Sequence, residues 1–191
     1  TPATKIGLQT ACIDDFNGNE GKAALGGTCR NIGCIPSKAL LDSSKQFHNL
    51  THAFEAHGIT AKDAKIDVAT MVGRKDKIVK QFTGGITQLF KANKITAFAG
   101  FATLHPDRAV KIKGGDGNTT ELKATNVIIA VGSVPIELPF AKFNGKTIVD
   151  NEGALDFEAV PKRIGGIGAG VIGLELGRGG SGLGRSAEEI F

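Results

Sequence analysis

Two cysteines close together near the start of the chain are the residues best suited to redox chemistry. Cys29 and Cys34 lie five positions apart in the run GGTCRNIGCIPSKALL, residues 26–41. On a regular α-helix their Cα atoms would be about 8.6 Å apart, from a rise of about 1.5 Å and a radius of about 2.3 Å. A disulfide needs Cα atoms within roughly 7 Å, so a bond here requires an irregular backbone, which Gly33 and Pro36 make possible. A strained small ring is easier to reduce than a structural disulfide, as a working redox pair requires.

Two other interpretations of the pair are two buried free thiols and half of a zinc site. Zinc sites prefer shorter gaps and a second ligand pair, which the sequence lacks, so no metal ligand is predicted. Three cysteines are too few and too odd in number for a secreted disulfide scaffold. The third, Cys12, lies in an apolar run and is expected to be an inert buried thiol.

Two further features have the pattern of nucleotide binding. GAGVIGLELG, residues 168–177, places a GxGxxG motif after a short strand and before a helix, where backbone N–H groups can approach a pyrophosphate. Asp14 closes an earlier strand, where an acidic residue can hydrogen-bond the ribose of a dinucleotide. The acidic residue that selects NAD over NADP is expected about 20 residues after the glycine motif, near or beyond Phe191.

In the first half of the chain, the positioning elements are predicted to be a helix end, a strand and two long helices. Residues 3–7 are expected to end a helix and residues 8–14 to form a strand. Apolar residues keep a helical period over 36–56 and again over 67–92, with Pro36 tolerable in a first turn. We expect these two helices to pack as a pair.

The second half of the chain is predicted to begin with strands. Short strands at 95–98, 109–112 and 121–122, with a turn at 114–118, indicate a small antiparallel sheet. The run NVIIAV, 126–131, is typical of a parallel strand buried on both faces.

A linker-like stretch to residue 146 is expected to precede a strand at 163–167 and a helix starting near Val171. Gly166 weakens that strand by about 1 kcal/mol relative to a packed residue. From Arg178 onward four glycines, each costing roughly 1 kcal/mol in a helix, predict that the helix cannot continue.

Composition excludes several function classes. The net charge is +4, but Lys and Arg are scattered among Asp and Glu, so nucleic-acid binding is not expected. No apolar run approaches the roughly 20 residues of a membrane span, and no secretory signal is evident. The expected protein is soluble, in the cytoplasm or an organelle matrix. The four histidines are expected to be surface or packing residues: His48, His52, His57 and His105.

The cysteine run resembles the active-site signature of the two-cysteine flavoprotein disulfide reductases, and IPSKALL is most similar to the dihydrolipoamide dehydrogenases of that family. The likeness continues through KALLDSS, FTGG, LFKAN, NVIIAVGSVP and GALDF to GAGVIGLELG. It implies an α/β fold of the glutathione-reductase type. Residues 1–146 would form an FAD-binding domain without its first strand and phosphate loop, and 147–191 the start of an NAD-binding domain. The family's general-base His and dimer interface would lie outside the chain.

By this resemblance Cys29 is the interchange thiol that attacks the substrate dithiolane, Cys34 is the thiolate held against the flavin, and Lys38 lies beside the flavin. A nearby lysine and a helix start both lower a thiol pKa, which agrees with these roles. Two residues depart from the family pattern: Arg30 stands at an ordinarily apolar position, and Val131 replaces a small hydroxyl residue. The implied FAD contacts are Asp14, Gly26, Gly27, Thr28, Ala102, Ala130, Val131 and Gly132. The implied residues of the second nucleotide motif are Gly168, Gly170, Val171, Ile172, Gly173 and Glu175.

The implied function is reoxidation of protein-bound dihydrolipoamide to lipoamide with FAD and NAD as cofactors. The implied partners are a second copy in a homodimer and the lipoyl domains of 2-oxoacid dehydrogenase or glycine cleavage complexes. The implied location is the bacterial cytoplasm or the mitochondrial matrix. One alternative is another two-cysteine flavin reductase of the mercuric reductase type. The other is a non-catalytic fragment that acts as a binding or surface protein, and the 191 residues alone are not expected to complete the catalytic cycle.

Overall fold

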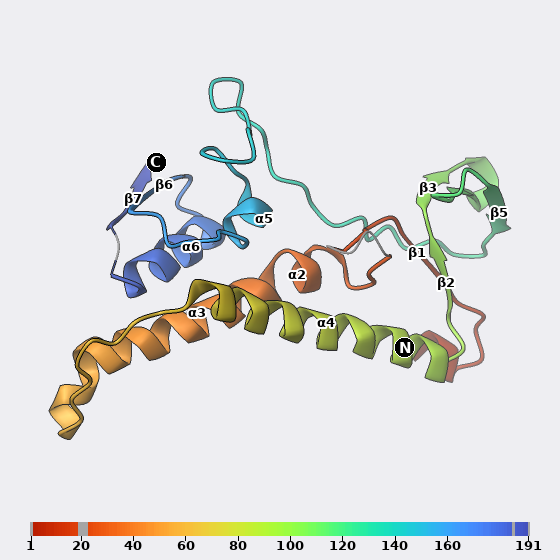
Figure 1. Ribbon diagram of the computed structural model, residues 1–191. Helices are drawn as coiled ribbons and strands as arrows, with labels where there is room; N and C mark the ends of the chain where they lie inside the picture. The colour runs from red at the N-terminus through yellow and green to blue at the C-terminus, as the bar shows by residue number, and fades with distance from the viewer. Residues whose placement is uncertain (1, 19–22, 185, 191) are drawn as a thin grey trace. The chain divides into compact units, whose positions relative to one another are not determined.

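The computed structural model describes residues 2–18, 23–184 and 186–190 (Figure 1). It forms two compact units that alternate along the chain. Unit 1 is Thr1–Asn31 with Lys80–Ser133, and unit 2 is Ile32–Val79 with Val134–Phe191. The predicted boundary at residue 146 does not coincide with a boundary between these units, and the assignment of 1–146 to FAD and 147–191 to NAD stays a prediction.

Unit 1 contains a short helix and a parallel pair of strands. Helix α1 (Pro2–Lys5) precedes β1 (Ala11–Asp14), as predicted for this part of the chain. β1 pairs in parallel with β2 (Thr96–Ala99), from Ala11 opposite Thr96 to Asp14 opposite Ala99. A parallel pair needs a long crossover connection, and the helices between β1 and β2 supply it. Ile95, just before β2, is buried.

The second sheet of unit 1 is antiparallel. It contains β3 (Phe101–Leu104), β4 (Ala109–Lys113) and β5 (Thr119–Lys123) in the order β3-β4-β5. A short 3-10 turn, η3 (Pro106–Arg108), connects β3 to β4, whose Val110 and Ile112 are buried. The antiparallel sheet and its turn are thus confirmed, but the inclusion of 95–98 is wrong, because β2 pairs with β1. Alternating side chains predict that a strand exists, whereas its partner depends on tertiary structure.

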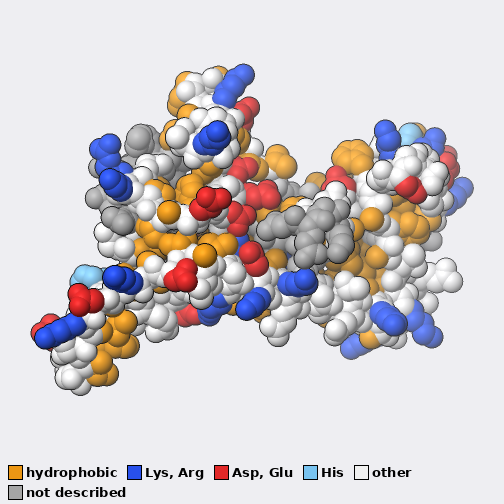
Figure 2. Space-filling model, viewed as in Figure 1, with side chains coloured by type: hydrophobic (Ala, Val, Ile, Leu, Met, Phe, Trp, Pro, Cys, Tyr) orange, Lys and Arg blue, Asp and Glu red, His pale blue; other side chains and the backbone are white. Residues whose placement is uncertain are grey.

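The predicted strand at 126–131 is wrong. These residues form no strand, and no described strand lies beside them. Ile128 is 89% exposed, Ile129 71% and Val131 89%. The β-branched composition suits a buried strand, but a strand also needs a neighbour to satisfy its backbone N–H and C=O groups. Hydrophobic side chains reach the surface at several places on the face drawn in Figure 2.

Two long helices follow one another along the chain, as predicted. The first is α3 (Cys34–His48), which a short helix, α2 (Gly27–Asn31), precedes. A π-helical turn, η1 (Asn49–Ala53), and a 3-10 turn, η2 (Phe54–His57), extend α3. Helix α4 (Val68–Ala92) begins where the Asp67 carboxylate accepts hydrogen bonds from the N–H and hydroxyl groups of Thr70, at 3.1 and 2.8 Å. Such a cap satisfies N–H groups that lack a helical partner.

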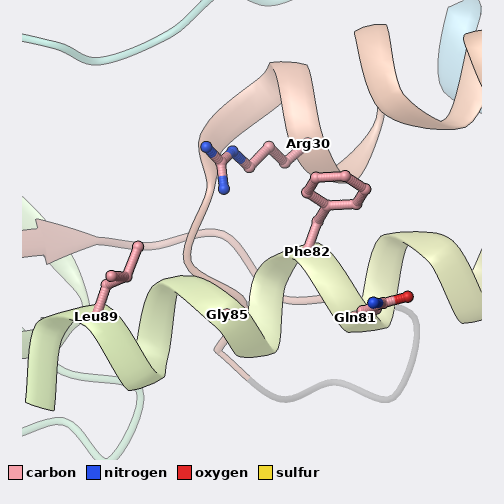
Figure 3. Close-up of a pocket in the computed structure, with 5 residues that line it drawn as sticks. All are labelled: Arg30, Gln81, Phe82, Gly85 and Leu89. Carbon is pink, nitrogen blue, oxygen red and sulfur yellow. The ribbon is translucent and has the colours of Figure 1, made fainter. Parts of the chain in front are cut away.

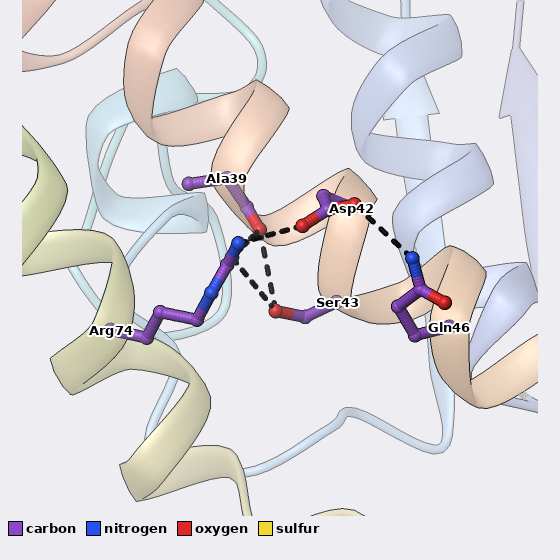
Figure 4. A network of polar contacts seen from close by, with 5 residues as sticks. All are labelled: Ala39, Asp42, Ser43, Gln46 and Arg74. Atoms are coloured by element: carbon purple, nitrogen blue, oxygen red, sulfur yellow. Dashed lines mark hydrogen bonds and ion pairs between the residues drawn. The ribbon is translucent and has the colours of Figure 1, made fainter.

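Arg74 joins the first half of α4 to α3 within unit 2 (Figure 4). Its guanidinium donates to the Ala39 carbonyl at 2.9 Å, to Ser43 Oγ at 3.2 Å and to Asp42 Oδ2 at 2.6 Å. The Gln46 amide also lies near the Asp42 carboxylate, at 3.5 Å. These contacts confirm the predicted helical pair for this part of α4.

Unit 2 ends with a strand, a helix and a second strand. β6 (Arg163–Ile167) and the start of α6 (Val171–Gly182) are where the sequence predicted them. β6 pairs in parallel with β7 (Ser186–Ile190), a strand that the sequence did not predict.

The prediction that the helix stops at Arg178 is wrong, since α6 continues to Gly182. The glycines let α6 approach α3 closely. Ser44 Oγ donates to the Gly179 carbonyl at 2.9 Å, and a Cβ atom at Gly182 would lie only 2.2 Å from that hydroxyl oxygen. Tertiary packing therefore offsets the low helix propensity of these residues.

The stretch between β5 and β6 contains one short helix, α5 (Asn151–Ala154), among the described residues. Before it, turns and an isolated bridge between Leu138 and Ala141 confirm the predicted linker-like character. After it, Leu155 is 4% exposed, and its carbonyl accepts a hydrogen bond from the buried ammonium of Lys75 at 3.3 Å.

Among residues 2–18, 23–184 and 186–190, no helix combines the length and apolarity needed to span a membrane.

Candidate redox and nucleotide-binding site

The two cysteines lie on either side of a break between two helices. Cys29 is in α2, which ends at Asn31, and Cys34 is the first residue of α3. Ile32 and Gly33 between them are not helical, which confirms the predicted irregular backbone. Both cysteines are exposed, so the interpretation as buried thiols is not supported. The boundary between the two units also falls here, between Asn31 and Ile32.

Cys34 begins helix α3. It is the first helical residue, and its N-cap, Gly33, provides no side-chain hydrogen bond. Pro36 fits the first turn as predicted, because the N–H that it lacks would have no helical partner there. The side chain of Pro36 is fully buried.

Lys38 and Glu175, two predicted cofactor residues, form an ion pair within unit 2. The Lys38 ammonium donates to Glu175 Oε1, and Ser37 Oγ donates to Glu175 Oε2 at 2.9 Å. The hydrogen bond from Lys38, aided by that from Ser37, holds the pKa of Glu175 below its ordinary value. The sequence predicted neither this pairing nor the contribution of Ser37, although Ser37 adjoins Lys38 in the motif.

In unit 1, two predicted FAD-contacting segments meet. The Ser133 N–H donates to Thr28 Oγ1 at 3.4 Å, and Thr28 Oγ1 lies at the same distance from the Ser133 carbonyl. Gly132 has a φ of +74°, and a Cβ atom there would lie 2.9 Å from Thr28 Oγ1. Glycine is therefore required both by the backbone conformation and by the space. Ala130 and Val131, the preceding predicted contacts, are exposed.

Asp14 and Ala102 lie in neighbouring elements of unit 1. Asp14 is the last residue of β1, and its Oδ1 accepts a hydrogen bond from the N–H of Phe16 at 3.0 Å. Its position at a strand end is the one that the sequence predicted. Ala102 is an exposed residue of β3 and pairs with Ile112 of β4.

A cavity of about 340 Å³ lies between α2 and the part of α4 in unit 1 (Figure 3). Arg30 reaches over it from α2, while α4 contributes Phe82 and Leu89; Gln81 and Gly85 complete the lining. The predicted site residue Gly26 adjoins the arginine stem: a Cβ atom at Gly26 would lie 3.0 Å from Cβ of Arg30. The unusual Arg30 is thus accommodated beside a glycine, with its charged end at an open cavity.

The second glycine motif lies at a strand–turn–helix junction, the context in which such a motif binds nucleotides. β6 ends at Ile167, and α6 begins at Val171. Gly168 has a φ of +98°, which favours glycine in this tight turn. The Gly170 carbonyl accepts the Leu174 N–H at 3.1 Å, so the first-turn N–H groups, including those of Val171, Ile172 and Gly173, lie outside the helical ladder.

The four histidines are exposed or partly exposed. His48 and His52 are exposed and stack with ring centroids 4.5 Å apart, and His57 is exposed as well. His105 is partly exposed. Their predicted character as surface or packing residues is confirmed.

Comparisons with known proteins show which protein family this chain is similar to. A family model described as pyridine nucleotide-disulphide oxidoreductase matches residues 2–188. A dihydrolipoyl dehydrogenase of Cupriavidus necator is 49% identical over 92% of this chain, and a mitochondrial dihydrolipoyl dehydrogenase of Caenorhabditis elegans is 46% identical over 92%. The chain spans 37% and 34% of the lengths of these two relatives.

A solved structure, LpdA of Mycobacterium tuberculosis, shows the same fold. Its TM-score is 0.86 at 24% identity, with 98% of this chain and 40% of that chain covered. This likeness confirms the predicted α/β fold of the glutathione-reductase type, and the family match confirms the resemblance seen in the cysteine motif. The chain belongs to the pyridine nucleotide-disulphide oxidoreductase family.

Proposed function

We propose that the protein carrying this chain is a flavoprotein disulfide oxidoreductase that reoxidises protein-bound dihydrolipoamide to lipoamide, with NAD as electron acceptor. The observation that carries the proposal is the 49% identity, over 92% of the chain, to a protein named dihydrolipoyl dehydrogenase. The exposed cysteine pair at a helix break supports it, because this chemistry needs accessible sulfur atoms.

The described residues fit FAD and NAD. In unit 1, the segments that contain Thr28 and Gly132 meet, and Asp14 presents a carboxylate at a strand end, where it can hydrogen-bond a ribose. In unit 2, the glycine turn before α6 offers first-turn N–H groups to a pyrophosphate. We assign FAD to the first set and NAD to the second. Bound FAD would relay two electrons from the cysteine pair to NAD, which accepts a hydride.

The cysteines would carry the first half of the reaction. A substrate thiolate attacks Cys29 Sγ of the Cys29–Cys34 disulfide, so that a mixed disulfide forms and Cys34 leaves as a thiolate. The second substrate thiolate attacks the substrate sulfur of that mixed disulfide. The lipoamide ring closes, Cys29 leaves as a thiolate, and the two electrons remain on the pair. The two substrate protons go to solvent or to a base.

Lys38 and the start of α3 would hold the negative charge that this step leaves on Cys34. Lys38 lies one helical turn after Cys34, on the same face of α3. Its ion pair with Glu175 restrains the direction in which the ammonium points.

We further propose that the protein is a homodimer whose partners are the lipoyl domains of 2-oxoacid dehydrogenase or glycine cleavage complexes. Its proposed location is the bacterial cytoplasm or the mitochondrial matrix, which the bacterial source of one relative and the mitochondrial names of others support.

An activity assay with two substrates tests the proposal. The protein that carries this chain is incubated with NAD and dihydrolipoamide, and separately with NADPH and mercuric ion. NADH formation with dihydrolipoamide, abolished in Cys29→Ser and Cys34→Ser but retained in Cys12→Ser, supports the proposal. Reduction of mercuric ion alone would replace it by the mercuric reductase alternative. Inactivity in both assays, with full FAD occupancy, would favour a non-catalytic protein.

A further inference from the structure

The break between the cysteines leaves one backbone carbonyl without a helical donor. In a continuous helix the Ile32 carbonyl would accept the N–H of residue 36, but that residue is proline and has no N–H. The proline ring would also clash with this carbonyl. Pro36 is fully buried, so its position is fixed. The next helical bond is present, since the Ser37 N–H donates to the Gly33 carbonyl at 3.1 Å.

Asn151 supplies the missing donor. Its side-chain Nδ2 donates to the Ile32 carbonyl at 2.9 Å, in a partly buried contact between residues 119 positions apart. A buried carbonyl without a partner is unfavourable by roughly 1–3 kcal/mol. The Asn151 amide therefore stabilises the particular backbone path that separates α2 from α3.

Both ends of α5 are themselves held, so Asn151 is presented from a fixed helix. At the start, the Asp150 carboxylate caps α5 by accepting the Gly153 N–H at 2.9 Å. At the end, Leu155 is buried, and its carbonyl accepts a hydrogen bond from Lys75. Lys75 is 3% exposed and forms a further ion pair with Asp156. A side chain mounted in this way fixes the position of the carbonyl that it binds.

We propose that Asn151 is a positioning residue for the Cys29–Cys34 pair, which holds the Ile32 carbonyl and so keeps the backbone bend that a disulfide between these cysteines requires. This inference rests on the proposed redox function of the pair. Cysteines five apart on a regular helix are too far apart to bond, so a fixed bend lowers the entropy lost when the ring closes. Loosening the bend should shift the equilibrium toward the dithiol.

The reduction potential of the pair is the quantity to measure, because a residue that merely supports the fold would leave it unchanged. The protein that carries this chain is equilibrated with mixtures of reduced and oxidised glutathione, where one glutathione disulfide and the Cys29–Cys34 dithiol give the protein disulfide and two reduced glutathiones. Acid quenching, alkylation and mass spectrometry then give the fraction of cross-linked Cys29–Cys34 peptide. Three variants are compared with the parent: Asn151→Ala, Asn151→Asp and Asn93→Ala.

Asn151→Asp keeps the size of the side chain but removes the donor, so it carries the test if Asn151→Ala does not fold. Asn93→Ala is the matched control, because Asn93 Nδ2 also donates to a backbone carbonyl, that of Leu89 at 2.8 Å. We expect both Asn151 variants to lower the equilibrium constant for disulfide formation three- to tenfold, a rise in potential of about 14–30 mV for a two-electron couple. The control should titrate like the parent.

Two negative results have different meanings. If the parent pair forms a reversible disulfide and the folded Asn151 variants titrate at its potential, the positioning role is wrong and the proposed function stands. If the parent pair never forms the disulfide at any glutathione ratio, the proposed function itself fails, and this inference fails with it.

Discussion

Lys38 and Glu175 show how two residues from distant motifs come together in one ion pair. Glu175 lies in α6, and Lys38 lies one helical turn after Cys34. The hydrogen bond from Lys38 lowers the pKa of Glu175 from its ordinary value of 4.5. The side chain of Lys38 is 61% exposed, so solvent screening limits what the pair contributes to stability.

Removing the lysine should therefore have a small, pH-dependent effect on stability. Because the pKa of folded Glu175 is depressed, the ion pair stabilises the protein above pH 4.5 and loses that effect as the pH falls through the depressed value. We expect Lys38→Gln to lower the free energy of unfolding by about 1 kcal/mol or less near pH 7. The difference from the parent, measured by urea unfolding at several pH values, should vanish at acidic pH. A difference that persists unchanged at low pH would contradict this account; Lys45→Gln, on the same helix, serves as the control.

The cysteines should differ in reactivity. Cys12 is half-buried rather than buried as predicted, and this partial burial, with a further contribution from Asp14, raises its pKa. Cys34 is exposed. Since the thiolate is the reactive form, we expect iodoacetamide to modify Cys34 at least several-fold faster than Cys12 in the reduced protein at neutral pH. Timed labelling followed by peptide mass spectrometry measures both rates. Equal rates in the folded protein, or faster modification of Cys12, would show that Cys12 is not protected.

At the scale of elements, the contact between α3 and α6 explains why α6 is helical although its glycines disfavour a helix. Glycine lowers helix stability by about 1 kcal/mol per residue in an exposed interior, and α6 contains several glycines in its last turns. Close approach of Ser44 to Gly179 and Gly182 requires residues without side chains. The same glycine-to-alanine change should therefore have opposite effects in α6 and at an open helical position.

Gly182→Ala and Gly84→Ala form a matched pair for this test. A Cβ atom at Gly182 would lie 2.2 Å from Ser44 Oγ, whereas one at Gly84 in α4 would meet nothing within 4 Å. We expect Gly84→Ala to stabilise the protein by about 0.5–1 kcal/mol and Gly182→Ala to destabilise it by about 1–3 kcal/mol. Chemical unfolding of each variant measures the change. Stabilisation by both substitutions would mean that α3 and α6 are not in close contact.

Sequence periodicity and turn residues predicted the local elements well. The capped helix α4, the strand β6, the start of α6 and the bend at Gly33 all depend on neighbouring residues, which a pattern can reveal. The contacts of Asn151 with Ile32 and of Ser44 with Gly179 join residues more than 100 positions apart. No local spacing encodes such pairs, so the sequence predicted neither them nor the length of α6.

For the molecule as a whole, the run around Ile128 is the largest difference between sequence and structure. Its composition predicted a strand buried on both faces, yet Ile128, Ile129 and Val131 are at least 71% exposed. Contiguous exposed apolar residues promote association and bind apolar dyes. We therefore expect the 191-residue polypeptide alone to bind an apolar fluorescent dye and to self-associate.

Threonine substitutions test this expectation. The double variant Ile128→Thr with Val131→Thr keeps the β-branched shape and should reduce both dye fluorescence and the mass measured by light scattering. Ile59→Thr replaces an isoleucine that is 50% exposed outside the run and should change little. A monomeric parent polypeptide that binds no dye would contradict the exposure of the run.

The most direct test of the central claim is to follow the Cys29–Cys34 cross-link during a single turnover. The protein that carries this chain, oxidised and free of oxygen, is mixed with one equivalent of dihydrolipoamide, and excess NAD is added afterwards. Peptide mass spectrometry quantifies the cross-linked peptide at each stage. We predict that the cross-link is lost on addition of dihydrolipoamide, with one equivalent of lipoamide formed, and returns when NAD is reduced. Lipoamide and NADH formed while the cross-link stays intact, or while both thiols stay open to alkylation throughout, would contradict a redox role for Cys29 and Cys34.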